Sequence, residues 1–528
     1  MIKKLYKSHK EYILLGIVLI LAIFFRYYHI YQWQFFGMDQ AYEAFLAQNI
    51  VTGHHFPLIG VNASDTGLYL GPLFIYFAAI PFFLSGGNPL GWSIVASLLG
   101  VVTTLVIFWV GKEMYNTRVG FLAAFLYAGS MLAAFYDRQF WNPMFVPLFS
   151  LIIGYFSFLL LKNSKKSVIV LAVLMGLSLH IHLSLLIFLP LVLYVTWKKK
   201  KLIGTKLIVA SIILFIFLQL PQIFFEVRHG FVNTREAFAL LSAKSNNTQT
   251  FLSRNNIFLS SVGRFVLLPF ASDLSLQSGQ CISLIGYKKD DIFLGFIVLF
   301  LILIVYFDRA GVFVEKVLKR KRKGPPVEFS AGSRVIVFIF FLSLLFTEFY
   351  TRGVFEYYFL FLFPWLAILL GRILDYTAQN RYGRMSIISV LLIFAVFNLV
   401  SLFTARFSFS YEKKMAAVNF AKKYVTAGNY SLEAVGECAR FGGYRYLFGH
   451  FAGIPVSSYM DSYFGWLYPT GRVKEQNLTV LLSLIDPRED AKTLSKWENI
   501  KLSLILENRI IAQNNFDTIQ IYVLGAKK

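Results

Sequence analysis

The residues of this chain that could do chemistry stand mostly at the ends of long apolar runs. Asp39 follows the first such run, in "FFGMDQAYEAFLAQNIVTGHHFP". Gln40 and Glu43 lie close behind it. One interpretation is that Asp39 only caps a short helix; the other is that its carboxylate faces a cleft and accepts a proton. The two interpretations predict different surroundings for the same side chain.

Further ionisable residues stand at the ends of other apolar runs. Asp137 and Arg138 lie in "YDRQFWNP", either as a pair that closes a helix end or as two groups that face one reaction site. Ionisable residues at membrane depth are costly and suggest function, although those at the ends of spans can reach water cheaply. The remaining candidates of this kind are Arg228, His229, His180, His182, Arg352, Glu356 and Tyr357.

The composition identifies the kind of protein that carries these residues. Of 528 residues, 57% are hydrophobic and only 15% are charged, which predicts a polytopic membrane protein. The net charge of +23 comes from Lys and Arg in short clusters between the apolar runs. Such clusters act as topology signals, so we expect no nucleic-acid partner.

The basic clusters also order the crossings. The first span covers residues 11–30 with its N-terminus inside, which puts Asp39 outside. Residues 71–84 are too few to span, since a crossing helix needs about 17–25 residues, so we expect an interfacial or re-entrant segment there. Residues 168–197 should cross twice, as two short helices that meet near "LHIHLS". With these choices every basic cluster is cytoplasmic, and the chain has about 11 spans.

On the outer side of the membrane, the sequence predicts a surface helix and a soluble domain. Apolar residues at helical spacing predict a helix over residues 40–52, with Asp39 as N-cap and Gly53 after its end. Residues 1–403 form the membrane domain, and residues 404–528 read as a small extracytoplasmic α/β domain. Its predicted elements are a helix at 412–426, ended by Gly428, and strands in "TVLLSLID", "IKLSLILE" and "TIQIYVLG".

The chain has two cysteines, Cys281 and Cys438, without the spacing of a metal site. They could form one disulfide if both lie outside the membrane. We favour unpaired, small apolar residues at both positions.

An outer carboxylate, several cations and lipid-facing helices suit the transfer of a group from a lipid phosphate to an outside acceptor. The sequence has no Gly-rich P-loop and no dinucleotide fingerprint. The activated donor should therefore arrive already attached to a lipid.

These residues resemble the membrane-embedded glycosyltransferases of the C-type fold, in the branch of protein O-mannosyltransferases (glycosyltransferase family 39) and aminoarabinose transferases. The resemblance covers roughly residues 13–370. It rests on Asp39-Gln40 in the first outer loop, where the family commonly has Asp-Glu. It also rests on the segments "GLYLGPLFIYF", "FYDRQFWNP", "LHIHLSLLIFLP" and "YYFLFLFP".

The resemblance implies a polyprenyl-phosphate sugar donor, the lipid bilayer as the site of reaction, and inverting displacement at the anomeric carbon. Asp39 would be the general base, and Asp137 would position substrate or help to bind a metal. The residues implied in phosphate or substrate binding are Arg138, Arg228, Arg352, His180, His182, His229, Gln40, Glu43, Glu356 and Tyr357. Because Gln40 replaces a family Glu, we favour chemistry without a divalent metal or any other cofactor.

Three alternatives stay open. A lipid-linked polysaccharide ligase or polymerase shares the chemistry but releases a lipid diphosphate. A transporter would place ionisable groups at mid-membrane on broken helices. A non-catalytic polymer-binding protein would not need Asp39 and Asp137. The acceptor is a glycan, lipid or protein, and the expected location is a prokaryotic plasma membrane, although the sequon at Asn62 leaves a lumenal setting open.

Overall fold

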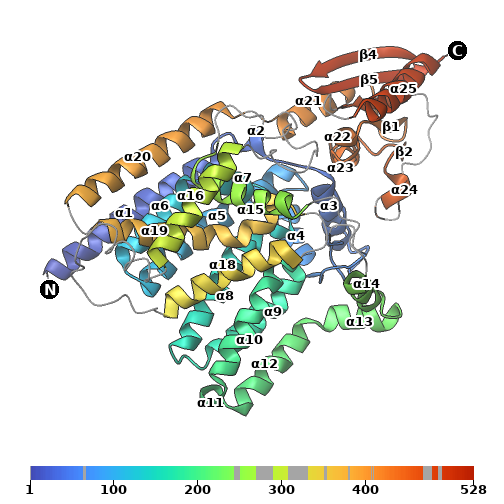
Figure 1. The fold of residues 1–528 in the computed structure, drawn as a ribbon. Coiled ribbons are helices and arrows are strands. Elements are labelled where there is room, and N and C mark those ends of the chain that lie inside the picture. Colours follow the sequence, from blue (N-terminus) through green and yellow to red (C-terminus); the bar gives the residue numbers. More distant parts are fainter. Residues whose placement is uncertain are drawn as a thin grey trace.

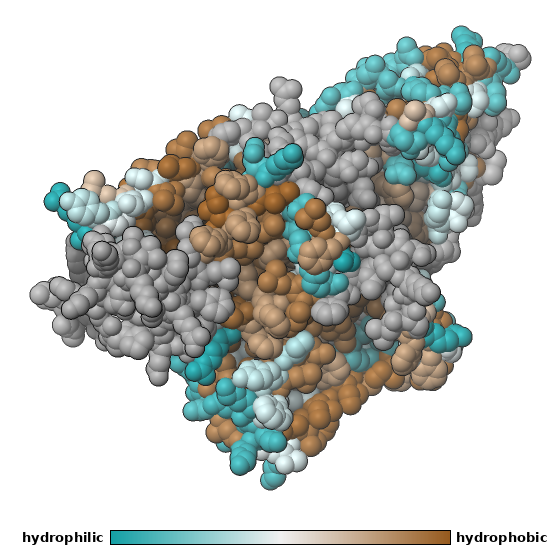
Figure 2. All heavy atoms as spheres, in the orientation of Figure 1, coloured by the Kyte–Doolittle hydropathy of each residue, from teal (hydrophilic) through white to brown (hydrophobic). Residues whose placement is uncertain are grey.

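The computed structural model describes residues 2–63, 67–242, 250–268, 289–306, 331–349, 354–378, 381–405, 407, 410–465, 467, 478–485 and 490–527. Long helices form one body, and a small sheet domain sits at one end of it, coloured red in Figure 1. On the face that Figure 2 shows, the coloured part of the helical body is largely apolar, while the sheet domain is mainly hydrophilic. The predicted fold class, a polytopic helical membrane protein with a small α/β domain, is confirmed.

The first half of the helical body contains α1 to α13. The helices are α1 (Ile2–Tyr27), α2 (Ile30–Trp33), α3 (Met38–Val51), α4 (Leu73–Leu84), α5 (Pro89–Met114), α6 (Thr117–Gly129), α7 (Met131–Asp137), η1 (Asn142–Phe145), α8 (Val146–Leu161), α9 (Ser167–Ile181), η2 (Leu183–Phe188), α10 (Leu189–Lys198), α11 (Lys200–Ile203), α12 (Thr205–Leu218) and α13 (Leu220–Arg228). Two pairs are bent sharply, α6 with α7 by 69° and α12 with α13 by 55°.

The second half contains α14 to α20. The helices are α14 (Val232–Ser242), α15 (Phe251–Val266), α16 (Lys289–Tyr306), α18 (Ala331–Phe349), η3 (Glu356–Leu362), α19 (Phe363–Thr377) and α20 (Arg381–Thr404). Within the described ranges, five helices are long and apolar enough to cross a membrane, or seven if each bent pair is one span. The count of about 11 spans stays a prediction.

Two of the topological expectations concern short helices. α4 has only 12 residues, in agreement with a segment too short to span. The expected break near "LHIHLS" lies at His182, between α9 and η2, because His182 adopts an extended backbone and its ring accepts from the Ser184 N–H. The first span ends earlier than predicted: α1 stops at Tyr27, and His29 has a left-handed φ of 52°.

The sheet domain follows α20. Its helices are α21 (Tyr411–Ala421), α22 (Glu437–Arg440), α23 (Tyr444–Phe451), α24 (Asp461–Phe464) and α25 (Ala491–Glu507), and its strands are β1 (Tyr430–Val435), β2 (Ser457–Ser458), β3 (Leu478–Ser483), β4 (Asn508–Phe516) and β5 (Ile519–Ala526). The strand order is β2-β1-β3-β5-β4. Strands β2, β1 and β3 pair in parallel, and β5 pairs antiparallel with both β3 and β4. The predicted boundary between the two domains, after residue 403, stays a prediction.

Two predictions in this domain are wrong. The segment "IKLSLILE" is not a strand, because Asp490 caps α25 through the N–H groups of Lys492 and Thr493 and the helix runs on to Glu507. Ile500 and Leu504 then pack beneath the sheet at helical spacing. Cys438 is disulfide-bonded, so the expectation of unpaired cysteines is also wrong; Cys281 lies outside the described residues.

Candidate active site

The helix that carries Asp39 begins two residues earlier than its sequence suggests. Gly37, not Asp39, is the N-cap of α3, and the Gln40 side-chain oxygen accepts a hydrogen bond from the Gly37 N–H at 2.9 Å. Asp39 therefore lies in the first turn, where the helix dipole favours a carboxylate, and its side chain is exposed. The prediction of Asp39 as the N-cap is wrong, and the cap that Gln40 supplies explains why a glutamine fits there.

Glu43 lies one turn after Asp39 and is fully buried. Its Oε1 accepts from the Asn142 N–H at 3.3 Å, while its Oε2 has no hydrogen-bond partner in the described part of the chain. Burial, and then the nearby Asp39 charge, raise the pKa of Glu43 well above its usual 4.5. α3 thus presents two carboxyl groups, one reaching solvent and one sheltered beneath it.

Aromatic side chains form a wall beside Glu43. Asn142 also donates from Nδ2 to the Ile181 carbonyl at 2.7 Å, which joins the loop after α7 to the end of α9. There the Trp141 and Tyr357 rings lie 4.8 Å apart between centroids, and the His182 ring lies 6.0 Å from Tyr357. The structure therefore brings together Glu43, His182 and Tyr357, three of the predicted site residues from distant parts of the sequence.

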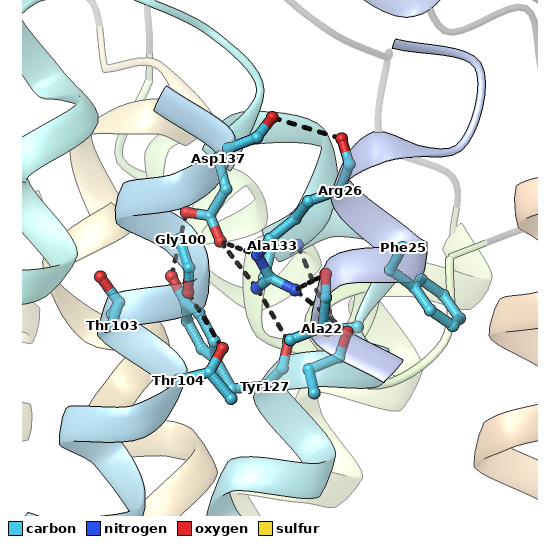
Figure 3. A network of polar contacts seen from close by, with 12 residues as sticks. Ala22, Phe25, Arg26, Gly100, Thr103, Thr104, Tyr127, Ala133 and Asp137 are labelled. Atoms are coloured by element: carbon cyan, nitrogen blue, oxygen red, sulfur yellow. Dashed lines mark hydrogen bonds and ion pairs between the residues drawn. The ribbon is translucent and has the colours of Figure 1, made fainter. Parts of the chain in front are cut away.

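Asp137 has a different environment (Figure 3). It is nearly fully buried and bonded through both oxygens: Arg26 Nε donates to Oδ2 at 2.9 Å, and Tyr127 Oη donates to Oδ1 at 3.1 Å. Gly100 of α5 permits this approach, because a Cβ there would lie 2.6 Å from Asp137 Oδ2. Asp137 ties α7 to α1 and α6, and its geometry is that of an interior ion pair.

Arg138 does not pair with Asp137, contrary to one of the two interpretations of that sequence. Its guanidinium is fully buried and donates from Nε to the Arg26 carbonyl at 3.1 Å, and from Nη2 to the Phe25 carbonyl. It also lies over the Trp33 ring, 4.7 Å from the centroid. Arg138 thus satisfies carbonyls at the C-terminal end of α1, where a cation is favoured.

Glu356 belongs to a second interior network. Its Oε1 accepts from Arg264 at 2.9 Å, its Oε2 accepts from Tyr136 at 3.0 Å, and Arg264 also bonds Asp291 at 3.1 Å. Tyr136 and Asp137 are adjacent on α7, so this short buried helix connects both networks.

The other predicted residues lie elsewhere. His180 packs against Gly71, where a Cβ would meet the ring, and its Nε2 contacts the Leu218 carbonyl at 2.9 Å. Arg228 and His229 are exposed at the end of α13. Arg352 lies outside the described residues. The described ranges contain no group of three His, Cys, Asp or Glu side chains that could hold a metal ion.

Sequence reasoning missed several residues of these networks, above all Arg26, Tyr127 and Arg264. Arg26 had a signal: it is a cation inside the first predicted span, a position at which a charge needs a partner. Arg264 had none, because it lies in a segment that reads as an outer loop.

Comparison with known proteins identifies similar folds. The family model for dolichyl-phosphate-mannose-protein mannosyltransferase matches residues 70–225. The crystal structure of ArnT from Cupriavidus metallidurans in the apo state matches with a TM-score of 0.57 at 10% identity, covering 98% of both chains. The same protein bound to undecaprenyl phosphate matches with a TM-score of 0.54 at 12% identity, covering 97% of both chains.

A more distant structural match is the Archaeoglobus fulgidus oligosaccharyltransferase in complex with Zn and sulfate, with a TM-score of 0.50 at 12% identity. It covers 89% of this chain and 67% of the archaeal one. No curated protein sequence matches the chain. The chain therefore has the fold of ArnT, which is the C-type fold of membrane-embedded glycosyltransferases.

Proposed function

We propose that this protein transfers a sugar from a polyprenyl-phosphate donor to an acceptor hydroxyl at the outer face of the membrane. The acceptor oxygen attacks the anomeric carbon, and the bond from that carbon to the phosphate oxygen breaks with inversion. The hydroxyl proton passes to the Asp39 carboxylate, and polyprenyl phosphate leaves. The observation that carries the proposal is the exposed Asp39 above buried Glu43, beside the aromatic wall.

The neighbours of Asp39 support its role as general base. Glu43 is fully buried with a raised pKa, so it favours the protonated form, while Asp39 is exposed to solvent. Two nearby carboxyl groups with different environments are a recurring arrangement in acid–base catalysis. Of the Trp141 and Tyr357 pair, Trp141 is buried and Tyr357 is half-buried, so Tyr357 is the ring that a sugar can contact.

We propose that this chemistry proceeds without a divalent metal. A family-type Asp-Glu pair could offer two neighbouring carboxylates, whereas here Gln40 directs its oxygen to the Gly37 N–H. Glu43 Oε1 accepts from the Asn142 N–H. Each side chain thus directs one oxygen to a backbone N–H.

The acceptor site is proposed at the junction of α3 and the sheet domain. A cavity lies there, lined by Tyr42 and Phe45 of α3 and by Arg440, Tyr459 and Phe464 of the sheet domain. The Tyr42 and Phe464 rings lie 5.3 Å apart. Substituting Phe464→Ala should raise the acceptor KM several-fold with the donor KM unchanged, whereas Tyr463→Ala, an exposed neighbour, should change neither. An unchanged acceptor KM in Phe464→Ala would remove this cavity from acceptor binding.

The test of the function is transfer by the purified protein in liposomes. Radiolabelled polyprenyl-monophosphate and polyprenyl-diphosphate sugars are supplied with a membrane extract as the acceptor source, and label transfer and free lipid phosphate are measured. We expect transfer from a monophosphate donor with equal release of polyprenyl phosphate. Transfer from diphosphate donors alone would identify a ligase or polymerase, and label that crosses the bilayer without transfer would identify a transporter.

A further inference from the structure

The sheet domain holds the segment that leads into α3. Lys414 of α21 is buried, with 2% of its surface exposed. Its ammonium group donates to the Phe36 carbonyl at 2.6 Å and to the Gly442 carbonyl at 2.9 Å. One side chain therefore bonds the backbone of the membrane domain, three residues before Asp39, and the backbone of the sheet domain.

A second contact caps α3 from the same side. The Met38 N–H is the first of the helix amides that no residue inside α3 can satisfy, and it donates to the Phe441 carbonyl at 2.9 Å. The Tyr411 N–H also donates to the Gln34 carbonyl at 3.2 Å. The first turn of the helix that carries Asp39 is thus completed by backbone atoms from more than 370 residues further along the chain.

The close approach depends on Gly443. This residue has a left-handed φ of 72°, and a Cβ placed on it would lie 2.6 Å from the Gly37 carbonyl oxygen. The two backbones therefore meet without room for a side chain, at the N-cap of α3. A glycine is required here for both reasons.

Burying the charge of Lys414 between the two domains costs free energy. Within the described part of the chain its charge meets two carbonyls and the rings of Phe35 and Tyr444, 5.3 and 5.6 Å from the ring centroids, rather than a carboxylate. Burial lowers the pKa of Lys414 to about 7. Because an apolar side chain would fill the same space at lower cost, the lysine is better explained by the position of the backbone that it fixes.

We infer that the sheet domain is a positioning part of the active site, and that Lys414 is the residue through which it sets the entry of α3 and hence the place of Asp39. This inference rests on the proposed function for its catalytic consequence, but not for its structural one. It predicts that removal of residues 404–528 abolishes activity outright, so truncation alone does not test acceptor binding by this domain.

The first experiment compares Lys414→Met with Lys413→Met in the full-length protein. Lys413 is the neighbouring lysine on α21 and pairs with Asp517 at the surface, so it provides a matched loss of charge. We expect kcat to fall about 100-fold in Lys414→Met, since a small misplacement of a catalytic group can cost that much, with donor KM changed less than about twofold. Lys413→Met should keep wild-type values.

Hydrogen exchange supplies the readout that does not depend on turnover. In Lys414→Met the amides of residues 38–41 should exchange about tenfold faster, a fold-change that corresponds to about 1.4 kcal/mol, while those of β3 and β5 keep their protection. Faster exchange across β3 and β5 would mean that Lys414 only stabilises the sheet domain. Unchanged exchange at residues 38–41 would overturn the inference.

A second pair of variants keeps the test independent of Lys414. Gly443→Ala pushes on the Gly37 carbonyl, whereas Gly53→Ala introduces the same left-handed strain, at φ 72°, with no atom within 4 Å of the new methyl group. Gly443→Ala should reproduce the loss of kcat and the faster exchange of α3, and Gly53→Ala should reproduce neither. If both variants behave alike, contact with the sheet domain does not position Asp39.

The two proposals fail in different ways. Wild-type protein that transfers no sugar from any donor would contradict the proposed function, yet the exchange comparison would still decide whether Lys414 positions α3. Wild-type protein that is active, with an equally active Lys414→Met variant, would contradict only the positioning role.

Discussion

Two acidic regions of this molecule, similar in sequence, have opposite environments. Asp137 is sealed inside the helical body, and Arg26 and Tyr127 bond both of its oxygens. On α3, Asp39 reaches the surface and Glu43 lies buried beneath it with one oxygen unbonded within the described ranges. Each Asp follows an apolar run and precedes a polar residue, and the sequence left both a structural and a chemical interpretation open for each of them.

The difference teaches how to separate structural from chemical carboxylates. A carboxylate whose lone pairs are all engaged by buried donors is committed to the fold, and removing its partner leaves an uncompensated charge. A carboxylate that reaches solvent beside a second acid keeps capacity to take a proton or bind a substrate hydroxyl. By this criterion Asp137 stabilises the position of α7, and Asp39 is the candidate for chemistry.

The largest effect that sharpens this comparison is expected from Asp137→Asn. The substitution leaves Arg26 buried without a counter-charge, which costs about 3–5 kcal/mol in known buried pairs. We expect most of the protein to be lost as aggregate and the remainder to unfold at a markedly lower temperature in detergent. Asp39→Asn is the control and should unfold within a degree or two of wild type, because Asp39 is exposed. Equal stability of both variants would contradict the view that Asp137, unlike Asp39, is part of the structural interior.

A smaller effect on the same network is expected from Gly100→Ala. The new methyl group would lie 2.6 Å from Arg26 Nε and from Asp137 Oδ2, and overpacking of this kind costs about 1–3 kcal/mol. Gly16→Ala in α1 is the control, because no atom lies within 4 Å of its added methyl group. An unchanged unfolding temperature in Gly100→Ala would show that α5 does not pack closely against the ion pair.

The smallest effect concerns pH and Glu43. Burial raises the pKa of this carboxyl, so the folded protein holds the proton more tightly than the unfolded chain does. Its contribution to stability is full below the usual pKa of 4.5 and is lost as pH rises through the folded-state pKa. In Glu43→Gln no proton is released from this position, so the variant does not lose this stability as pH rises. The loss in wild type is at most about 1.4 kcal/mol per pH unit for one proton.

Unfolding midpoints of wild type and Glu43→Gln measured from pH 5 to pH 9 test this expectation. Wild type should lose stability relative to the variant as pH rises. Parallel curves over the whole range would mean that burial does not raise the pKa of Glu43.

The sequence predicts the membrane domain well and its polar interior poorly. Apolar length predicts α5, α8 and α20 directly, and the shortness of α4 follows from counting residues. The pairing of Arg26 with Asp137 could not be predicted, because 111 positions separate them and α6 bends by 69° into α7, which carries Asp137. Glu43, His182 and Tyr357 were singled out individually, but their convergence depends on Asn142 bonds that no spacing reveals.

In the sheet domain local signals decided which predictions were right. Strands β3 and β5 are apolar, lie at the centre of the sheet and were predicted from composition. Residues 500–507 were assigned to a strand because their Leu and Ile residues suit both structures, whereas the Asp490 cap lies well before them. The edge strand β4 is largely exposed and gave no apolar pattern to read.

The measurement that tests the central claim most directly is the single-turnover rate of sugar transfer by Asp39→Asn. Asp490→Asn, which alters an exposed capping carboxylate on α25, is the matched control. Loss of a general base costs about 10²–10⁴ in rate, so we expect transfer by Asp39→Asn to fall in that range while donor binding and unfolding temperature are retained. Transfer at the wild-type rate by a folded, donor-binding Asp39→Asn protein would contradict the account.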